Sequence, residues 1–444
     1  MLETDINTVD LIIEARWIIP GAPRGILLEH AALAIAQGRI VAILPIIEAR
    51  QRFHALETVS LPTHALIPGL VNLHTHAAMV LMRGLADDVP LMAWLNERIW
   101  PAESHVVSDR FVHDGTLLAC AEMLRGGVTC FNDMYFFPQA AAEAIDRIGM
   151  RACLGLAVLE FPSPYAVDAD DYLNKGLAVR DELRDHERIT TCLAPHAPYT
   201  VSDRTFGRLM TYADQLGLSL HLHLHETLDE IAQSEAQYGL RPLQRLIGLG
   251  LMGPNLLATH CVHLTPGEIE TLAAQHCHVA HCPSSNLKLG SGIAPVASLL
   301  AVGVNVGLGT DGAASNNRLD MFSEMRMAAL LAKSAGDASC LSAAQALEMA
   351  TLNGARALGL EDRIGSIEPG KIADLVAVDF SATEMMPCFD PISHLVYVAG
   401  REHVSHTWVA GELRCEHGVH VGVEQMELKE IARLWQGRLK QFHR

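Results

Sequence analysis

The stretch that decides the fold runs from Pro68 to His76 and reads P-G-L-V-N-L-H-T-H. A turn residue followed by an apolar run predicts a buried strand, and this strand ends in two histidines. Side chains on a strand alternate between its two faces, so His74 and His76 point the same way. Such a pair can supply two imidazole ligands to a metal ion, although an isolated H-x-H is more often incidental. The interpretation therefore depends on the rest of the chain.

Apolar strand-like runs alternate with helix-length amphipathic stretches through the middle of the chain. We expect eight strands, at residues 66–73, 128–133, 152–159, 190–193, 219–225, 256–260, 278–281 and 304–309. Helices are expected between them, among others at residues 110–125, 202–216 and 265–275. Eight such units predict an α/β fold, a TIM-like (β/α)8 barrel over residues 66–375. Barrels of this kind carry their active sites at the C-terminal ends of the strands.

The two ends of the chain have a different character. Short strand-like runs occur at residues 11–15, 31–36, 39–44, 373–378, 394–397 and 406–413. Because strands from both ends can pair in one sheet, we expect a small composite β-sandwich domain built from residues 1–65 and 376–444.

The composition disfavours several classes of protein. The formal net charge of −18 argues against a nucleic-acid partner, because phosphate backbones are bound by cationic surfaces. No apolar run reaches the roughly 18 to 20 residues that a membrane-spanning helix needs. The acidic first ten residues do not resemble a secretory signal. We interpret Cys277 and Cys282, which lie among histidines, as packed thiols rather than a zinc cluster. These features predict a soluble cytoplasmic protein with reduced cysteines.

Three further expected strands end in polar residues. Residues 221–226 read H-L-H-L-H-E, residues 257–260 read L-A-T-H, and residues 307–311 read G-L-G-T-D. Three histidines and a carboxylate from the ends of different strands make a site for one zinc or similar divalent ion. The chain has 23 histidines, but chance would not place them at the ends of these strands in this order.

These motifs, together with H-A-P-Y at residues 196–199, resemble the amidohydrolase superfamily over nearly the whole chain. The resemblance implies metal ligation by His74, His76, His223 and Asp311. Many two-metal members carry a carbamylated lysine on the fourth strand, whereas residues 193–199 contain no lysine. This departure favours one divalent ion, most simply Zn²⁺, and the deaminase branch of the superfamily. Iron or manganese would suit the same ligands. Relatives commonly pair, so a homo-oligomer is expected.

Hydrolytic deamination by a metal-activated hydroxide needs one group that protonates the ring nitrogen and another that accepts the proton of the water. Glu226 fits the proton shuttle and would contact the ring, although it could also be a surface or helix-capping carboxylate. Asp311 can ligate the metal and hydrogen-bond the water. We expect His260 to polarise the water or the new oxygen rather than ligate the metal; the alternative is a core histidine.

Residues 77–103 are similar to the branch that deaminates 5'-methylthioadenosine and S-adenosylhomocysteine. The resemblance implies that Glu103 accepts hydrogen bonds from the ribose, Trp94 covers the sugar or thioether, and His196 adds a polar contact. Trp94 could otherwise be plain core, and Glu103 a charge at the start of a helix. The apolar run at residues 152–162 favours 5'-methylthioadenosine over S-adenosylhomocysteine, whose charged tail needs a cation.

Two alternatives stay open. Guanine or cytosine deamination, or triazine dechlorination, would use the same metal ligands with a different region around residues 94–103. A non-catalytic barrel scaffold is a remote alternative, because such proteins generally lose ligand residues that are all present in this chain.

Overall fold

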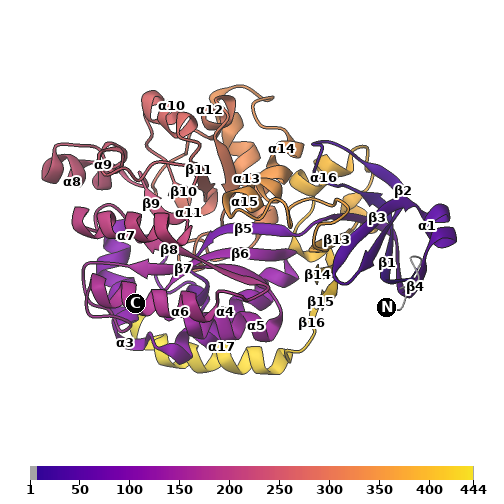
Figure 1. Ribbon diagram of the computed structural model, residues 1–444, viewed down its shortest axis with the longest axis horizontal. Helices are drawn as coiled ribbons and strands as arrows, with labels where there is room; N and C mark the ends of the chain where they lie inside the picture. Colours follow the sequence, from indigo (N-terminus) through magenta and orange to yellow (C-terminus); the bar gives the residue numbers. More distant parts are fainter. Residues whose placement is uncertain (1–7, 444) are drawn as a thin grey trace.

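The computed structural model describes residues 8–443 and contains two eight-stranded sheets. One sheet is parallel and runs in chain order, and its first and last strands pack together to close a barrel (Figure 1). Its strands are β5 (Leu70–Thr75), β6 (Val128–Tyr135), β7 (Arg151–Val158), β8 (Ile189–Pro195), β9 (Leu220–Leu224), β10 (Leu256–His260), β11 (His278–His281) and β12 (Asn305–Leu308). The eight strands expected from the sequence are all present, and the (β/α)8 prediction is confirmed.

Helices cover the outside of the barrel, as Figure 1 shows. They are α4 (Asp109–Arg125), α5 (Pro138–Ile148), α6 (Ala169–Glu182), α7 (Asp203–Leu216), α8 (Leu228–Tyr238), α9 (Pro242–Gly248), α10 (Pro266–Ala274), α11 (Pro283–Lys288), α12 (Val296–Ala301), α13 (Met321–Ala332), α14 (Ala343–Met349) and α15 (Leu352–Ala357). The three helices named from the sequence lie where they were expected. All three begin at capping side chains: Ser108 accepts from the N–H of Phe111, Ser202 from that of Thr205, and Thr265 from that of Glu268.

A helical excursion separates β5 from α4. It contains the 3-10 helix η1 (Ala77–Met82), the short α2 (Leu91–Ala93), the π-helix η2 (Trp94–Ile99) and α3 (Trp100–Val106). The single π-turn and the helices beside it place several side chains of this excursion in the pocket at the barrel mouth. π-turns of this kind often occur at functional sites.

The second sheet joins both ends of the chain, in the order β16-β15-β14-β13-β4-β1-β2-β3. Its strands are β1 (Thr8–Ile18), β2 (Leu28–Ala36), β3 (Arg39–Pro45), β4 (His54–Pro68), β13 (Leu375–Asp379), β14 (Val404–Val409), β15 (Glu412–Glu416) and β16 (Val419–His420); the short helix α1 is Ile46–Arg52. β4 pairs with β1 on one side and with β13 on the other, so strands from both termini share one sheet, as expected.

Two strand predictions near the C-terminus were wrong in detail. Residues 394–397 belong to helix α16 (Pro391–Tyr397), because Asp390 accepts hydrogen bonds from two N–H groups of its first turn. Residues 406–413 are not one strand: β14 ends at Val409, and the chain turns through Ala410 and Gly411, both at positive φ, before β15 begins.

The last long helix, α17 (Gln425–Leu439), leaves the terminal sheet and runs along the barrel (Figure 1). The indole N–H of Trp435 donates to Asp114 of α4 over 2.9 Å, and its ring meets Phe111 edge-on. Short 3-10 helices complete the fold: η3 (Lys333–Ala335), η4 (Thr383–Met385), η5 (Arg401–His403) and η6 (Lys440–Phe442). Within residues 8–443, none of the helices combines the length and the apolar character needed to cross a membrane.

Candidate active site

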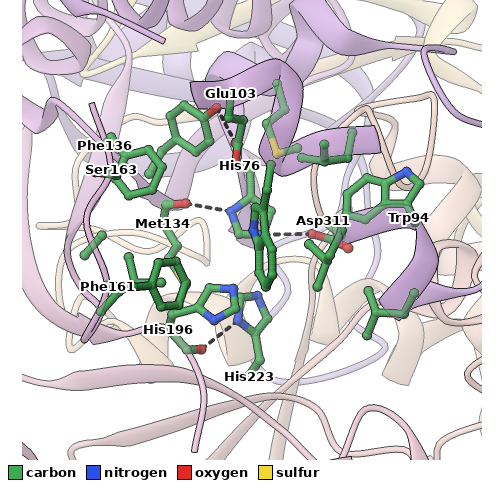
Figure 2. A pocket seen from close by; sticks show the side chains of 18 of the residues that line it. His76, Trp94, Glu103, Met134, Phe136, Phe161, Ser163, His196, His223 and Asp311 are labelled. Atoms are coloured by element: carbon green, nitrogen blue, oxygen red, sulfur yellow. Dashed lines mark hydrogen bonds and ion pairs between the residues drawn. The ribbon is translucent and has the colours of Figure 1, made fainter. Parts of the chain in front are cut away.

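A buried pocket of about 150 Å³ opens at the C-terminal ends of the barrel strands (Figure 2). Eight of the nine residues that the sequence nominated line it: His76, Trp94, Glu103, His196, His223, Glu226, His260 and Asp311. The ninth, His74, is fully buried and lies 3.3 Å from His223 between their Nε2 atoms. The structure therefore brings all nine residues into one neighbourhood.

Four of these side chains present donor atoms to a common point. The Nε2 atoms of His74 and His76 lie 3.2 and 3.3 Å from Oδ1 of Asp311. His74 also groups with His76 and His223, with donor atoms within 4.8 Å of one another. Three imidazoles and one carboxylate are the donors that zinc and related divalent ions prefer. The chemistry of the donor set thus fits a metal ion.

Backbone carbonyls orient two of the imidazoles. Nδ1 of His76 lies 2.6 Å from the carbonyl oxygen of Met134, and Nδ1 of His223 lies 2.7 Å from that of His196. A carbonyl oxygen can only accept, so Nδ1 of each ring carries the hydrogen. In the neutral ring the lone pair then resides on Nε2, which faces the cluster, as metal-binding histidines require.

Asp311 is fixed from its other side. Its Oδ2 accepts hydrogen bonds from the hydroxyls of Ser285 and Ser315, at 2.6 and 2.7 Å, which leaves Oδ1 facing the imidazoles. Burial would raise the pKa of Asp311, but hydrogen bonds and charges from His74 and His76 hold it well below its usual range. The carboxyl is therefore ionised at neutral pH.

The barrel seam brings the ends of β5 and β12 together. The side chain of Asn72 donates to the hydroxyl of Thr310 and accepts from its backbone N–H, over 2.8 and 2.9 Å. Gly309 packs so closely that an added Cβ would lie 2.8 Å from the backbone nitrogen of His74. A glycine is needed there because any side chain would push His74 and Asp311 apart.

Glu226 and His260 stand beside the donor cluster. Oε2 of Glu226 lies 3.7 Å from Nε2 of His260, while Nδ1 of His260 lies 2.8 Å from Oδ1 of Asn286. The donor atoms of His260, His74 and Asp311 also lie within 4.8 Å of one another, so His260 belongs to a second candidate group for a metal ion. Burial raises the pKa of Glu226, which favours a carboxyl that can carry a proton.

Glu230, which sequence reasoning missed, holds the loop that carries Glu226. One of its carboxyl oxygens accepts from the N–H of His225 at 3.0 Å, and the other from the N–H of Glu226 at 2.8 Å. His225 has a φ of +53°, a conformation that a non-glycine residue adopts only when its surroundings enforce it. The spacing H-E-x-x-x-E at residues 225–230 is the feature of the sequence that could have pointed to Glu230.

The far wall contains the residues expected to meet a nucleoside. Glu103 is buried and accepts a hydrogen bond from the hydroxyl of Tyr135 at 2.6 Å. Burial raises the pKa of Glu103 to about 7, against the lowering effect of that hydrogen bond. The indole Nε1 of Trp94 is buried and has no hydrogen-bond partner among residues 8–443. Burial lowers the pKa of His196 to about 3, so its ring is neutral.

The outer end of the pocket is apolar. Its lining includes Phe136, Leu159, Phe161, Pro162 and Pro164, and no lysine or arginine of the described chain belongs to it. Arg151, the cation nearest this run in the sequence, begins β7 at the opposite end of the barrel and pairs with Asp374 at 2.9 Å.

The loop at residues 281–286 supports two of these side chains. The hydroxyl of Ser285 donates to Asp311, and the side chain of Asn286 contacts His260. Cys277 and Cys282 are buried thiols, as expected, and neither belongs to a candidate metal group among residues 8–443.

Comparison with known proteins places this geometry in context. The chain matches the amidohydrolase family over residues 65–414. It is 47% identical to a 5-methylthioadenosine/S-adenosylhomocysteine deaminase of Teredinibacter turnerae, covering 98% of this chain and 99% of the relative. It is 44% identical to the protein of the same name in Saccharophagus degradans, covering 98% of each.

A solved structure agrees with the fold. The crystal structure of an adenosine deaminase from Xanthomonas campestris with bound zinc superposes with a TM-score of 0.97, at 50% identity, covering 98% of this chain and 99% of that one. The zinc complex of atrazine chlorohydrolase from Arthrobacter aurescens, at 23% identity, has a TM-score of 0.89 and covers 96% of this chain and 99% of that one, which shows a shared fold. With its barrel, its strand-end histidines and these relatives, the chain belongs to the amidohydrolase family, as its motifs predicted.

Proposed function

We propose that the protein hydrolyses the adenine ring of 5'-methylthioadenosine to the inosine analogue and ammonia. One observation carries this proposal: a buried metal-type donor set, an acid with a raised pKa and a wall that contains Trp94 and Glu103 share one pocket. Relatives that cover nearly the whole chain at up to 47% identity are named for deamination of this nucleoside class.

The metal proposal is one divalent ion, Zn²⁺, held by His74, His76, His223 and Asp311. The described fourth strand carries no lysine at its end, which supports one ion rather than two. When bound, such an ion lowers the pKa of water towards ~7 and so supplies a nucleophile at neutral pH.

The proton transfers are assigned to Glu226 and Asp311. Glu226, with its raised pKa, delivers a proton to the ring nitrogen N1, while Asp311 accepts a hydrogen bond from the attacking water. His260 faces Glu226 and stabilises the negative charge that develops on the new oxygen. Glu226 also contacts the purine that it protonates.

Three residues are proposed to recognise the nucleoside. Glu103 keeps one carboxyl oxygen for the ribose hydroxyls, because Tyr135 uses the other. Trp94 lies over the sugar or thioether and offers its unpartnered N–H, and His196 supplies a polar edge from β8.

The tail of the substrate decides between two nucleosides. S-adenosylhomocysteine ends in an amino acid with both charges, and burying these without partners is costly. The outer pocket is apolar and, within residues 8–443, is lined by no lysine or arginine. A methylthio group suits this wall, so 5'-methylthioadenosine is the proposed preferred substrate, with S-adenosylhomocysteine and adenosine as weaker ones.

The alternatives are less well supported. Guanine or triazine chemistry would leave the buried Glu103–Tyr135 pair without a sugar to bind. A non-catalytic scaffold gives no reason for eight nominated residues to line one pocket.

Two further features of the protein are proposals. One is the division into a composite terminal domain, residues 1–65 and 376–444, and a barrel, residues 66–375. The other is a homo-oligomeric state.

The direct test is turnover of 5'-methylthioadenosine by the zinc-loaded protein. Ammonia release should accompany the ultraviolet change from adenine to hypoxanthine. Guanine and S-adenosylhomocysteine serve as parallel substrates. Absence of turnover on every adenosine derivative, with bound metal verified, would refute the proposal, and turnover of guanine would move the protein to that alternative.

A further inference from the structure

A second cavity, of about 580 Å³, lies between the terminal sheet and the foot of the barrel. Its lining comes from both parts of the fold: Arg39 and Arg414 belong to strands β3 and β15 of the terminal sheet, whereas Arg151 and Arg188 lie at the starts of β7 and β8. The N-terminal ends of barrel strands face away from the mouth where the proposed active site lies.

The cavity concentrates positive charge in an acidic protein. Its five lining arginines are Arg39, Arg151, Arg188, Arg363 and Arg414, and its three lining acids are Asp10, Glu187 and Glu412. The whole chain, in contrast, has 33 lysines and arginines against 51 aspartates and glutamates. This local reversal of charge is the feature that the proposed function does not use.

Two of the arginines lack a carboxylate partner among residues 8–443. Arg39 donates to the carbonyl oxygen of Gly370 at 2.9 Å, and Arg363 donates to that of Glu187 at 3.2 Å. A carbonyl dipole does not neutralise a guanidinium. Arg151 differs, because the carboxylate of Asp374 accepts two hydrogen bonds from it and neutralises its positive charge.

Two further arginines pair with carboxylates, Arg188 with Asp146 and Arg414 with Glu412, yet each keeps one buried donor unused. The Nε atoms of Arg188 and Arg414 are buried and have no hydrogen-bond partner within the described chain. Native proteins rarely leave buried donors unpaired. Gly149, at positive φ, packs directly against the guanidinium of Arg414, where a Cβ would collide with it.

The cations also act on one another. Burial lowers the pKa of Arg363, and the nearby charges of Arg151 and Arg39 lower it further. Burial lowers the pKa of Arg414 as well; the charge of Glu412 opposes this effect, and the charge of Arg188 adds to it. Like charges held together in this way are stabilised when an anion lies among them.

We propose that this cavity is a binding site for a small molecule that carries a diphosphate or a similar multiply charged phosphate group. Guanidinium groups are suited to phosphate because their planar forks donate two parallel hydrogen bonds. The cavity volume lies within the range of small-molecule sites and exceeds what a single phosphate fills. An anion there would bridge the terminal sheet and the barrel.

The test is calorimetric titration of the zinc-loaded full chain with inorganic pyrophosphate and with uridine 5'-diphosphate. The second probe has no exocyclic amine, so the proposed deaminase reaction cannot consume it. Arg39→Gln and Arg363→Gln remove cations that bind only carbonyl oxygens, and Arg433→Gln, on the exposed face of α17, is the matched control. Arg363→Lys keeps the positive charge but lacks the planar guanidinium that can donate two parallel hydrogen bonds to phosphate.

We expect each cavity variant to weaken pyrophosphate binding about tenfold or more, with Arg433→Gln unchanged and Arg363→Lys intermediate. Tighter binding of uridine 5'-diphosphate than of pyrophosphate would identify a nucleotide, and equal binding would identify the diphosphate group alone. Binding that is equal in all variants, or that potassium chloride of the same ionic strength reproduces, would overturn the proposal. Deamination at the other end of the barrel is an independent readout.

Discussion

Tyr135 at the end of β6 donates its hydroxyl hydrogen to the buried carboxylate of Glu103 over 2.6 Å, joining a barrel strand to the helical excursion above it. The bond occupies one carboxyl oxygen and fixes the direction of the other. Tyr135 is therefore a positioning residue for the proposed ribose contact, although it was not recognised in the sequence.

Removing this hydroxyl should weaken binding of the sugar. For Tyr135→Phe we expect the KM for 5'-methylthioadenosine to rise about tenfold with little change in kcat, because a charged hydrogen bond contributes about 1.5–3 kcal/mol. An analogue without the 2'- and 3'-hydroxyls is the control and should show almost no difference between variant and wild type. An equal loss with both substrates would mean that Tyr135 only supports the fold.

Glu226 should be indispensable for turnover. Glu226→Gln keeps the size of the side chain but cannot carry the proton, so kcat should fall by about 10²–10⁴-fold. Asp229→Asn, three residues further on an exposed position of α8, is the matched control and should retain full activity. Steady-state ammonia release measures both. Comparable activity of the two variants would show that another group transfers the proton.

Glu230 links stability to pH. Burial raises its pKa from the ordinary 4.5 to about 8, so between these values the folded state holds a proton that the unfolded state releases. The free energy of unfolding should therefore decrease as pH rises from about 4.5 to about 8. Urea denaturation of Glu230→Gln should lack this decrease, whereas Glu235→Gln, exposed on α8, should behave as wild type. A pH profile of Glu230→Gln parallel to that of the wild type would contradict the assignment.

The apolar outer wall should exclude a charged substrate tail. We expect kcat/KM for 5'-methylthioadenosine to exceed that for S-adenosylhomocysteine. Phe161, 37% exposed at the pocket rim, is the position at which a cation can be added. Phe161→Arg should raise kcat/KM for S-adenosylhomocysteine about tenfold relative to kcat/KM for 5'-methylthioadenosine. Phe161→Leu should leave this ratio unchanged. A wild-type preference for S-adenosylhomocysteine would refute this account.

Removal of the metal should abolish activity reversibly. Treatment with dipicolinate should stop turnover, and one equivalent of Zn²⁺ per chain should restore it and raise the Tm, because the ion binds only the folded state. His223→Ala should lose the ion, while His54→Ala is the control, since His54 is exposed on β4 and belongs to no candidate metal group among the described residues. Two ions per wild-type chain, as measured by atomic absorption, would refute the single-ion proposal.

The sequence was most informative where periodicity and chemistry coincide. Strand ends such as 72–76 and 221–226 combine an apolar alternation with histidines, and both the barrel and the grouping of its polar residues follow from that pattern. Residues 394–397 have the composition of a strand, but the capping hydrogen bonds of Asp390 and the proline after it begin a helix. Local capping outweighed strand propensity there.

Supporting residues were harder to find because their partners are distant in the chain. Ser285 reaches Asp311 and Tyr135 reaches Glu103 only after the barrel has closed, and no periodic pattern marks either residue. The arginines of the second cavity are similarly scattered from residue 39 to residue 414. Their grouping depends on how the terminal sheet packs against the barrel.

The seam between β5 and β12 has a consequence for how the site forms during folding. Asn72 and Thr310, whose side chains join the seam, are 238 residues apart. The proposed ligand His74 lies two residues after Asn72, and the proposed ligand Asp311 directly follows Thr310. Loop closure over such a distance is slow compared with local helix formation. No fragment short of the complete ring of strands brings the four proposed ligands together. Catalytic activity should therefore appear only when the barrel closes, and not gradually as structure accumulates.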